Sequence, residues 1–227
     1  MTGWFLAILL AGSPTPDVQS IPAAEFVSKI ESQVQAGSLL VSAGDCLAVK
    51  TFTGSPYTHV AIVVPREGRS FVYDSTSGRG VRCQTLANYL GWLGTHDVLI
   101  LNPQTPLSDA RVAALTRHLD GELGRPYAVL HHITGERCEG VHCAEYLTDA
   151  FVAAELLKVR SAPKVSPASL VEGLTRGSLY AEAGRFQKIE PVVAPANTGS
   201  WCGDCWAETK SCSVWCWTKV KGLVLCQ

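Results

Sequence analysis

Residues 56–64 read Pro-Tyr-Thr-His-Val-Ala-Ile-Val-Val, and the expected fold is built around them. The histidine stands at the head of a continuous apolar run, which is typical of a strand that is buried on both faces of a sheet. Arg66 to Arg69 contains Glu-Gly and predicts a hairpin turn, so residues 71–74 read as the return strand. The hairpin brings His59 near Asp74, because antiparallel strands place such ends side by side.

Residues 141–147 read Val-His-Cys-Ala-Glu-Tyr-Leu and form the second decisive stretch. The pattern from Cys143 to about residue 157 predicts a helix with one apolar stripe, made of Tyr146, Leu147, Ala150, Phe151 and Ala154. A thiol at a helix N-terminus meets the positive end of the helix dipole, which favours the thiolate. Cys143 is therefore a candidate nucleophile.

A cysteine nucleophile needs a base, and His59 is the best candidate for that role. Asp74 would hold the ring of His59 in one tautomer, although an aspartate in a turn-rich stretch can also simply cap the turn. Glu145 falls in the first helical turn, where a carboxylate is favoured for structural reasons alone. We rank His59 above the other candidate bases, which are His131, His132 and His142, the last because a neighbouring residue usually points away.

The remaining pattern alternates short strands and helices and predicts an α+β protein. Helices are expected over residues 22–35, 86–93, from Ser108 to about 123, and from Ser166-Pro167 onward, with Ser108 as an N-cap. Further strands are expected in residues 38–49, 97–101 and 186–193. Residues 13–22 and 191–200 are rich in Pro, Gly or Ser and read as linkers. The predicted organisation is an N-terminal apolar segment and linker (1–21), a catalytic domain (22–190) and a linker with a tail (191–227).

Composition is that of a folded globular chain. The 227 residues are 47% hydrophobic and 17% charged, which is enough to bury a core. The net charge of −1 gives no electrostatic case for nucleic acid or an anionic membrane. The N-terminal apolar run is too short to cross a bilayer, and no Lys or Arg precedes it as in a signal peptide. The cytoplasm is favoured slightly over export, and the compartment stays open.

The C-terminal tail is rich in cysteine and tryptophan. Cys202, Cys205, Cys212 and Cys216 follow the pattern C-x2-C-x6-C-x3-C, which is compatible with a tetrahedral zinc site. Disulfides are the alternative for an exported protein, and disorder is the third possibility. Four tryptophans stand among these cysteines, so the tail is also a candidate contact for a protein partner or a membrane surface.

Five short segments, taken in order, resemble a known family. These segments are Gly44-Asp45, Thr58-His59-Val60-Ala61-Ile62-Val63, Val72-Tyr73-Asp74, Leu123-Gly124-Arg125-Pro126-Tyr127 and His142-Cys143-Ala144-Glu145-Tyr146-Leu147. They are similar to the motifs of NlpC-type cysteine hydrolases. Because the histidine precedes the cysteine, the order matches the circularly permuted papain-like branch, with the YiiX/YaeF-like amidases and the relatives of lecithin:retinol acyltransferase. Ala128, Ala144 and Asp74 depart from the residues usual there, which puts the substrate in doubt.

The resemblance implies a small antiparallel sheet or barrel packed against helices, and a thiol hydrolase of amides or esters. Cys143 would be the nucleophile, His59 the base and Asp74 its orienting acid, with no cofactor for catalysis. Tyr57 and Tyr127 would contact the substrate, which would be a small peptide, a cell-wall fragment or a lipid. The alternatives are an acyltransferase that uses the same cysteine, and an inactive binding module that acts through its tail.

Overall fold

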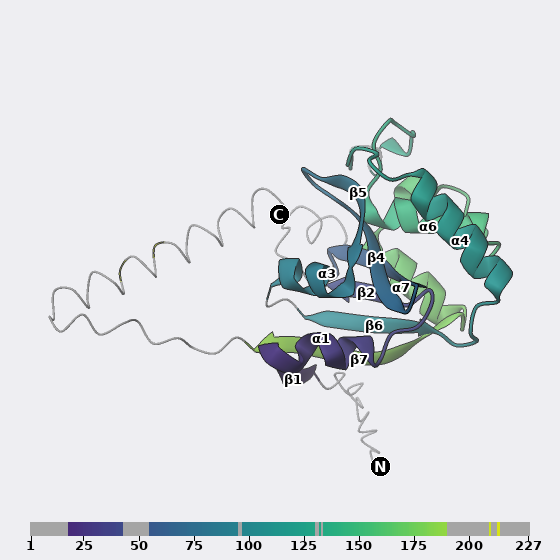
Figure 1. The fold of residues 1–227 in the computed structure, drawn as a ribbon. Helices are drawn as coiled ribbons and strands as arrows, with labels where there is room; N and C mark the ends of the chain where they lie inside the picture. Colours follow the sequence, from purple (N-terminus) through teal and green to yellow (C-terminus); the bar gives the residue numbers. More distant parts are fainter. Residues whose placement is uncertain are drawn as a thin grey trace, which may run out of the picture.

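Seven strands form one open, mixed sheet in the order β1-β7-β6-β2-β3-β4-β5 (Figure 1). The computed structural model describes residues 18–42, 55–94, 97–129, 132, 134–189, 209 and 213. β1 runs parallel to β7, and the other neighbours are antiparallel. The strands are β1 (Val18–Pro22), β2 (Leu39–Ser42), β3 (His59–Arg66), β4 (Arg69–Thr76), β5 (Gly80–Thr85), β6 (Val98–Pro103) and β7 (Tyr180–Ile189).

Helices cover both faces of this sheet. They are α1 (Ala23–Glu31), α3 (Leu86–Leu93), α4 (Asp109–Gly121), α6 (Cys143–Ala153) and α7 (Pro167–Arg176), with a short 3-10 turn at Ala162–Lys164. One apolar core lies between the sheet and helices α4, α6 and α7. A second core lies between the opposite face and helices α1 and α3. Side chains of the central strands alternate between the two cores, as the two-residue period of a strand requires.

The β3–β4 hairpin agrees with its sequence pattern. Val60 to Val64 are all buried, which confirms a strand covered on both faces. Glu67 and Gly68 both have positive φ, 48° and 73°, as a two-residue hairpin turn of type I′ requires. Because Val60 and Ile62 face the α6 side and Ala61 and Val63 the α3 side, the alternation places His59 on the α3 side.

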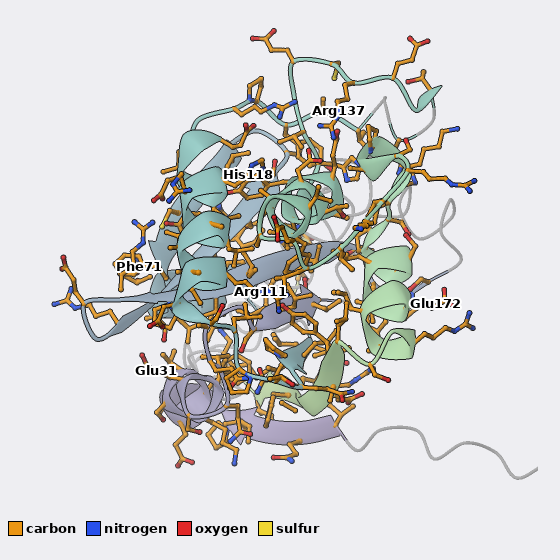
Figure 2. The ribbon with its side chains drawn as sticks, turned by 90° about the vertical axis from the view of Figure 1, so that its right-hand side faces the viewer. Glu31, Phe71, Arg111, His118, Arg137 and Glu172 are labelled. Carbon is orange, nitrogen blue, oxygen red and sulfur yellow. The ribbon has the colours of Figure 1, made fainter. Side chains whose placement is uncertain are left out.

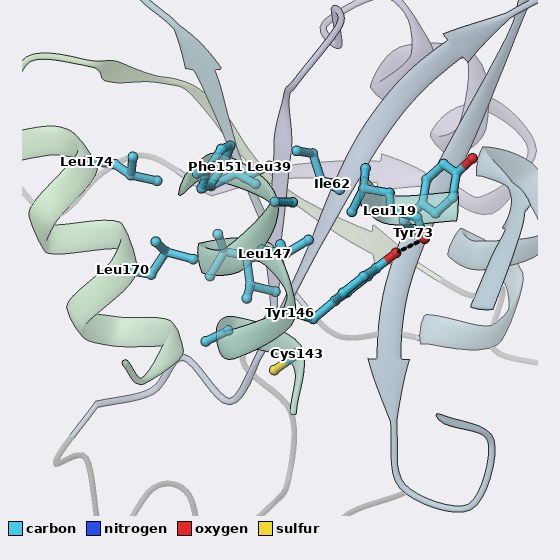
Figure 3. Close-up of a cluster of buried hydrophobic side chains, with 14 of the residues drawn as sticks. Leu39, Ile62, Tyr73, Leu119, Cys143, Tyr146, Leu147, Phe151, Leu170 and Leu174 are labelled. Atoms are coloured by element: carbon cyan, nitrogen blue, oxygen red, sulfur yellow. Dashed lines mark hydrogen bonds between the residues drawn. The ribbon is translucent and has the colours of Figure 1, made fainter. Parts of the chain in front are cut away.

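Helix α6 is the central helix of the larger core. All of its first six residues are buried, and it contacts α4, α7, β3 and β4. Figure 3 shows its apolar stripe facing Leu39 and Ile62 of the sheet on one side and Leu170 and Leu174 of α7 on the other. The hydroxyl of Tyr146 donates to the carbonyl of Leu119 at 2.8 Å and ties α6 to α4. The start of α6 at Cys143 is therefore fixed by packing on several sides.

The fold corrects the expected architecture in two respects. The sheet has seven strands, is mixed and stays open within the described residues, so the small antiparallel or barrel form is wrong. The expected linker at residues 13–22 ends in a strand, because Val18–Pro22 pairs with β7, which itself begins six residues earlier than expected. None of the described helices is long and apolar enough to cross a membrane.

Candidate active site

Three side chains from the β3–β4–β5 meander form a hydrogen-bonded chain. His59, the first residue of β3, donates from Nε2 to Oδ2 of Asp74 at 3.1 Å. Arg82 lies opposite Asp74 in the β4–β5 register and donates from Nε to Oδ1 at 2.8 Å and from Nη2 to Oδ2 at 3.0 Å. The side chain of Asp74 is fully buried, so its carboxylate depends on these two partners for its charge.

Cys143 adjoins this hydrogen-bonded set of side chains at the end of the sheet. It is the first residue of α6, and His59 is the first residue of β3, so both functional groups stand where their elements begin. Figure 3 shows the Cys143 sulfur at the N-terminal end of α6. Because Nε2 of His59 is engaged with Asp74, Nδ1 is the ring nitrogen that can exchange a proton with the thiol.

The interaction of His59 with Cys143 changes the pKa values of both groups. Burial alone would lower the pKa of His59, but hydrogen bonds with Asp74 and Cys143 and their charges raise it to about 10. Burial alone would raise the pKa of Cys143, but hydrogen bonds and charge interactions with His142 and His59 lower it to about 6. At a pH between about 6 and about 10, the favoured state is therefore the thiolate of Cys143 beside the imidazolium of His59.

His142 also borders the thiol, but it has a structural task. It is the N-cap of α6, where its Nδ1 accepts from the amide of Glu145 at 3.3 Å. Its Nε2 lies 3.0 Å from the carbonyl of Pro163, and this contact requires Nε2 to carry the proton. A neutral ring with its proton on Nε2 satisfies both bonds, so a proton taken up on Nδ1 would displace the helix cap.

Backbone bonds on two sides hold the segment around Tyr127 in place. On one side, the amide of Val81 donates to the carbonyl of Arg125 at 2.8 Å; on the other, the amide of Val141 donates to the carbonyl of Pro126 at 2.9 Å. Gly80 permits this approach, because a Cβ there would lie 2.3 Å from the carbonyl oxygen of Arg125. Tyr127 is thereby placed where burial, and to a smaller degree the charge of Cys143, raise the pKa of its hydroxyl.

Two further residues hold the loop before Cys143: Ser75, which the sequence did not indicate, and Arg125, which the sequence indicated only as part of the motif at residues 123–127. Ser75, next to Asp74, donates to the carbonyl of Val141 at 2.7 Å in a buried position. Arg125 donates to three carbonyls of that loop, those of Cys138, Glu139 and Gly140, at 2.7–3.2 Å. Strand β4, which carries Asp74, and the loop before Cys143 are thus joined directly by a hydrogen bond.

The loop is also fastened to α6 itself. Arg137, labelled in Figure 2, forms two hydrogen bonds with the carboxylate of Asp149, at 2.7 and 2.6 Å. It also lies 3.6 Å from Glu145, whose carboxylate is fully buried. The segment that leads into Cys143 is therefore anchored at β4, in the segment after α4 and along α6.

Helix α3 forms an aromatic wall beside His59. The ring of Tyr89 stacks on the imidazole with centroids 6.4 Å apart, and Trp92 meets it edge-on at 6.1 Å. The guanidinium of Arg82 lies over the indole of Trp92, 4.3 Å from the ring centre. Tyr89 is fully buried, whereas 36% of Trp92 is exposed, so this wall reaches the surface next to the candidate base.

The other predicted site residues lie apart from this group or outside the described residues. The hydroxyl of Tyr57 accepts from Nη2 of Arg185 at 2.7 Å, and both line a small cavity with Val41 and Leu99. Its contact with substrate stays a prediction. The tail cysteines 202, 205, 212 and 216, as well as Gly44, Asp45 and His131, lie outside the described residues. Among those described, no cluster of three or more His, Cys, Asp or Glu could hold a metal ion.

Comparison with known proteins gives one structural similarity of interest. No protein-family model matches the chain, and no curated protein matches it in sequence. A crystal structure of the metalloprotein yiiX from Escherichia coli O157:H7 superimposes with a TM-score of 0.47 and 17% identity, over 63% of this chain and 82% of that one. A similarity of this size identifies neither a family nor a reaction. The permuted papain-like assignment stays a prediction from the motifs.

Proposed function

We propose that this protein is a thiol hydrolase that cleaves an amide or ester bond through a Cys143-acyl intermediate. The observation that carries the proposal is that Cys143 stands at the head of a buried helix with its pKa lowered by His142 and His59, and that His59 is itself held by a buried aspartate. A nucleophile, a base and a group that orients the base are the minimum set for acyl transfer.

The first half-reaction would begin with the thiolate of Cys143 and the imidazolium of His59. The sulfur attacks the substrate carbonyl carbon, and a C–S bond forms while the carbonyl oxygen becomes an oxyanion. The amide N–H of Cys143, which has no partner within its own helix turn, is one donor to this oxygen. The Tyr127 hydroxyl is the candidate second donor. His59 then gives its proton to the leaving nitrogen or oxygen, and the original acyl bond breaks.

The second half-reaction would release the acyl group. A water gives one proton to His59 as its oxygen attacks the thioester carbon, and the C–S bond breaks to restore the thiolate. If an alcohol or amine takes the place of water, the same residues perform acyl transfer. The substrate class of a peptide, cell-wall fragment or lipid, and a structural zinc in the tail, are part of this proposal.

The proposal is tested by alkylation with iodoacetamide from pH 5 to 9, mapped cysteine by cysteine. We expect Cys143 to react fastest below pH 7 and to lose this advantage in His59→Ala. Cys83 is an internal control, because burial raises its pKa. An electrophilic acyl ester then tests for a thioester on Cys143, and its products separate hydrolysis from transfer. If Cys143 shows the pH dependence of the other cysteines, the enzyme proposal fails and a binding module is favoured.

A further inference from the structure

Arg82 is placed to act on the candidate base through the carboxylate between them. Its guanidinium engages both oxygens of Asp74, and one of these oxygens, Oδ2, also accepts from His59. Asp74 is fully buried, and the Arg82 side chain is 14% exposed. This is a planar, two-bonded pairing for which lysine is a poor substitute.

Two cations can compensate the negative charge of Asp74: Arg82, which is always charged, and His59, which is charged only when protonated. When His59 is protonated, the carboxylate faces two cations; when His59 is neutral, Arg82 is the cation that remains in contact with it. A buried carboxylate without a cation would take up a proton or hold one on its neighbour. Arg82 allows His59 to lose its proton while Asp74 stays charged.

We propose that Arg82 is the positioning residue that keeps Asp74 charged and aligned on His59 while the imidazole changes its protonation state. The catalytic meaning of this role rests on the proposed function. The effect of Arg82 on His59 is a property of the site itself. Arg82 in turn lies over the ring of Trp92, 4.3 Å from the ring centre. The order of contacts is therefore Trp92, Arg82, Asp74, His59 and Cys143.

The other titratable groups near this unit come from three parts of the chain. Besides Arg82, these are Tyr89 of α3, Cys143 of α6 with its cap residue His142, and Tyr127 of the segment after α4; Cys83 of β5 lies on the opposite face, across from Tyr73. Of these, Arg82 is the group that carries a fixed positive charge. Removing it makes every nearby group hold its proton more tightly, which fixes the sign of the test.

The test follows the His59 ring by NMR in full-length Cys143→Ser protein, so its result does not depend on whether the thiol is reactive. In Arg82→Gln we expect the His59–Asp74 pair to keep its proton to a pH about one unit higher. Arg79→Gln is the matched control, because Arg79 is exposed in the turn of the same β4–β5 hairpin. It removes the same charge, and we expect no shift.

Arg82→Lys keeps the charge, so it tests alignment in a variant that is expected to fold. We expect the pH midpoint to stay near that of the parent while the His59 Nε2–H signal broadens, because one ammonium group cannot make both bonds to Asp74. An unchanged midpoint in folded Arg82→Gln overturns the proposal, and so does an unchanged Nε2–H signal in Arg82→Lys. Failure of the enzyme proposal would show separately, as an unreactive Cys143 in the parent protein.

Discussion

Two histidine–carboxylate pairs border the same thiol, and they differ in what their ring nitrogens do. His59 uses Nε2 for Asp74, which leaves Nδ1 as the nitrogen that can exchange a proton with Cys143. His142 uses Nδ1 to cap α6 and Nε2 for the carbonyl of Pro163, with Glu145 3.9 Å away. The two histidines together lower the pKa of Cys143. On the bonds described, His59 keeps one ring nitrogen available for proton exchange, whereas both nitrogens of His142 hold the helix cap and the Pro163 carbonyl.

The comparison shows that proximity in sequence is a poor guide to a catalytic base. His142 is the neighbour of Cys143 in the chain, whereas His59 lies 84 residues away. A base must have one nitrogen oriented and the other available. The hydrogen-bond partners of each ring distinguish the candidate base, His59, from the helix cap, His142.

Removal of His59 should have the largest effect. We expect His59→Ala to reduce acyl turnover by about 10³-fold, since the thiolate loses its partner and the leaving group loses its proton donor. His142→Asn should stay within about tenfold, because asparagine is also a good N-cap. Turnover of an activated ester, with His118→Ala on α4 as control (Figure 2), measures both. A larger loss in His142→Asn would reverse the two roles.

The next largest effect should be the difference in turnover between substitutions of the two carboxylates, Asp74 and Glu145. Asp74→Asn should lower turnover by about a hundredfold, because the ring of His59 loses the charge that orients it. Glu145→Gln, which is of equal size and also buried, should change turnover by less than about tenfold. Urea unfolding of both variants checks the fold. Equal losses of turnover in two equally stable variants would contradict the distinction between the pairs.

The pH dependence should distinguish thiolate formation from proton donation. Turnover needs the thiolate, whose pKa is about 6, and the imidazolium, whose pKa is about 10, so we expect a bell with limbs near these values. Alkylation needs the thiolate alone and should not fall on the alkaline side. The raised pKa of His59 stabilises the fold below pH 6.5 and this contribution fades toward pH 10. Rates for both reactions from pH 5 to 11 test the expectation; a matching alkaline fall in alkylation would refute it.

The smallest expected effect is on the free energy of unfolding of His142 variants. His142→Ala removes the cap of α6 and the bond to Pro163, which should lower the free energy of unfolding by about 1–2 kcal/mol. His142→Asn should recover most of the cap contribution. Denaturant unfolding of the two variants gives the difference directly. If alanine and asparagine destabilise equally, the cap bond of His142 contributes nothing.

Some site residues could be predicted because their signals are local. His59 heads a buried strand, Asp74 ends its hairpin partner and Cys143 begins an amphipathic helix, and each pattern lies within about 15 residues. Arg82 was missed, because its pairing with Asp74 depends on the register of the β4–β5 pair rather than on a motif. Ser75 was missed for a similar reason, because its hydrogen bond reaches the carbonyl of Val141 in a loop distant in sequence. Arg125 stood within a quoted motif, but its bonds to the carbonyls of residues 138–140 depend on how that loop folds.

The elements that carry the candidate site residues follow from the sequence, because strand and helix periods and helix caps are local properties of the chain. The sequence also places a thiol at a helix head and an imidazole at a strand head. Which groups meet is a property of the folded chain: β1 pairs with β7 from the far end of the domain, and residues 124–128 lie between β5 and the loop before Cys143. These meetings depend on long-range packing and strand register, which no short stretch of sequence contains.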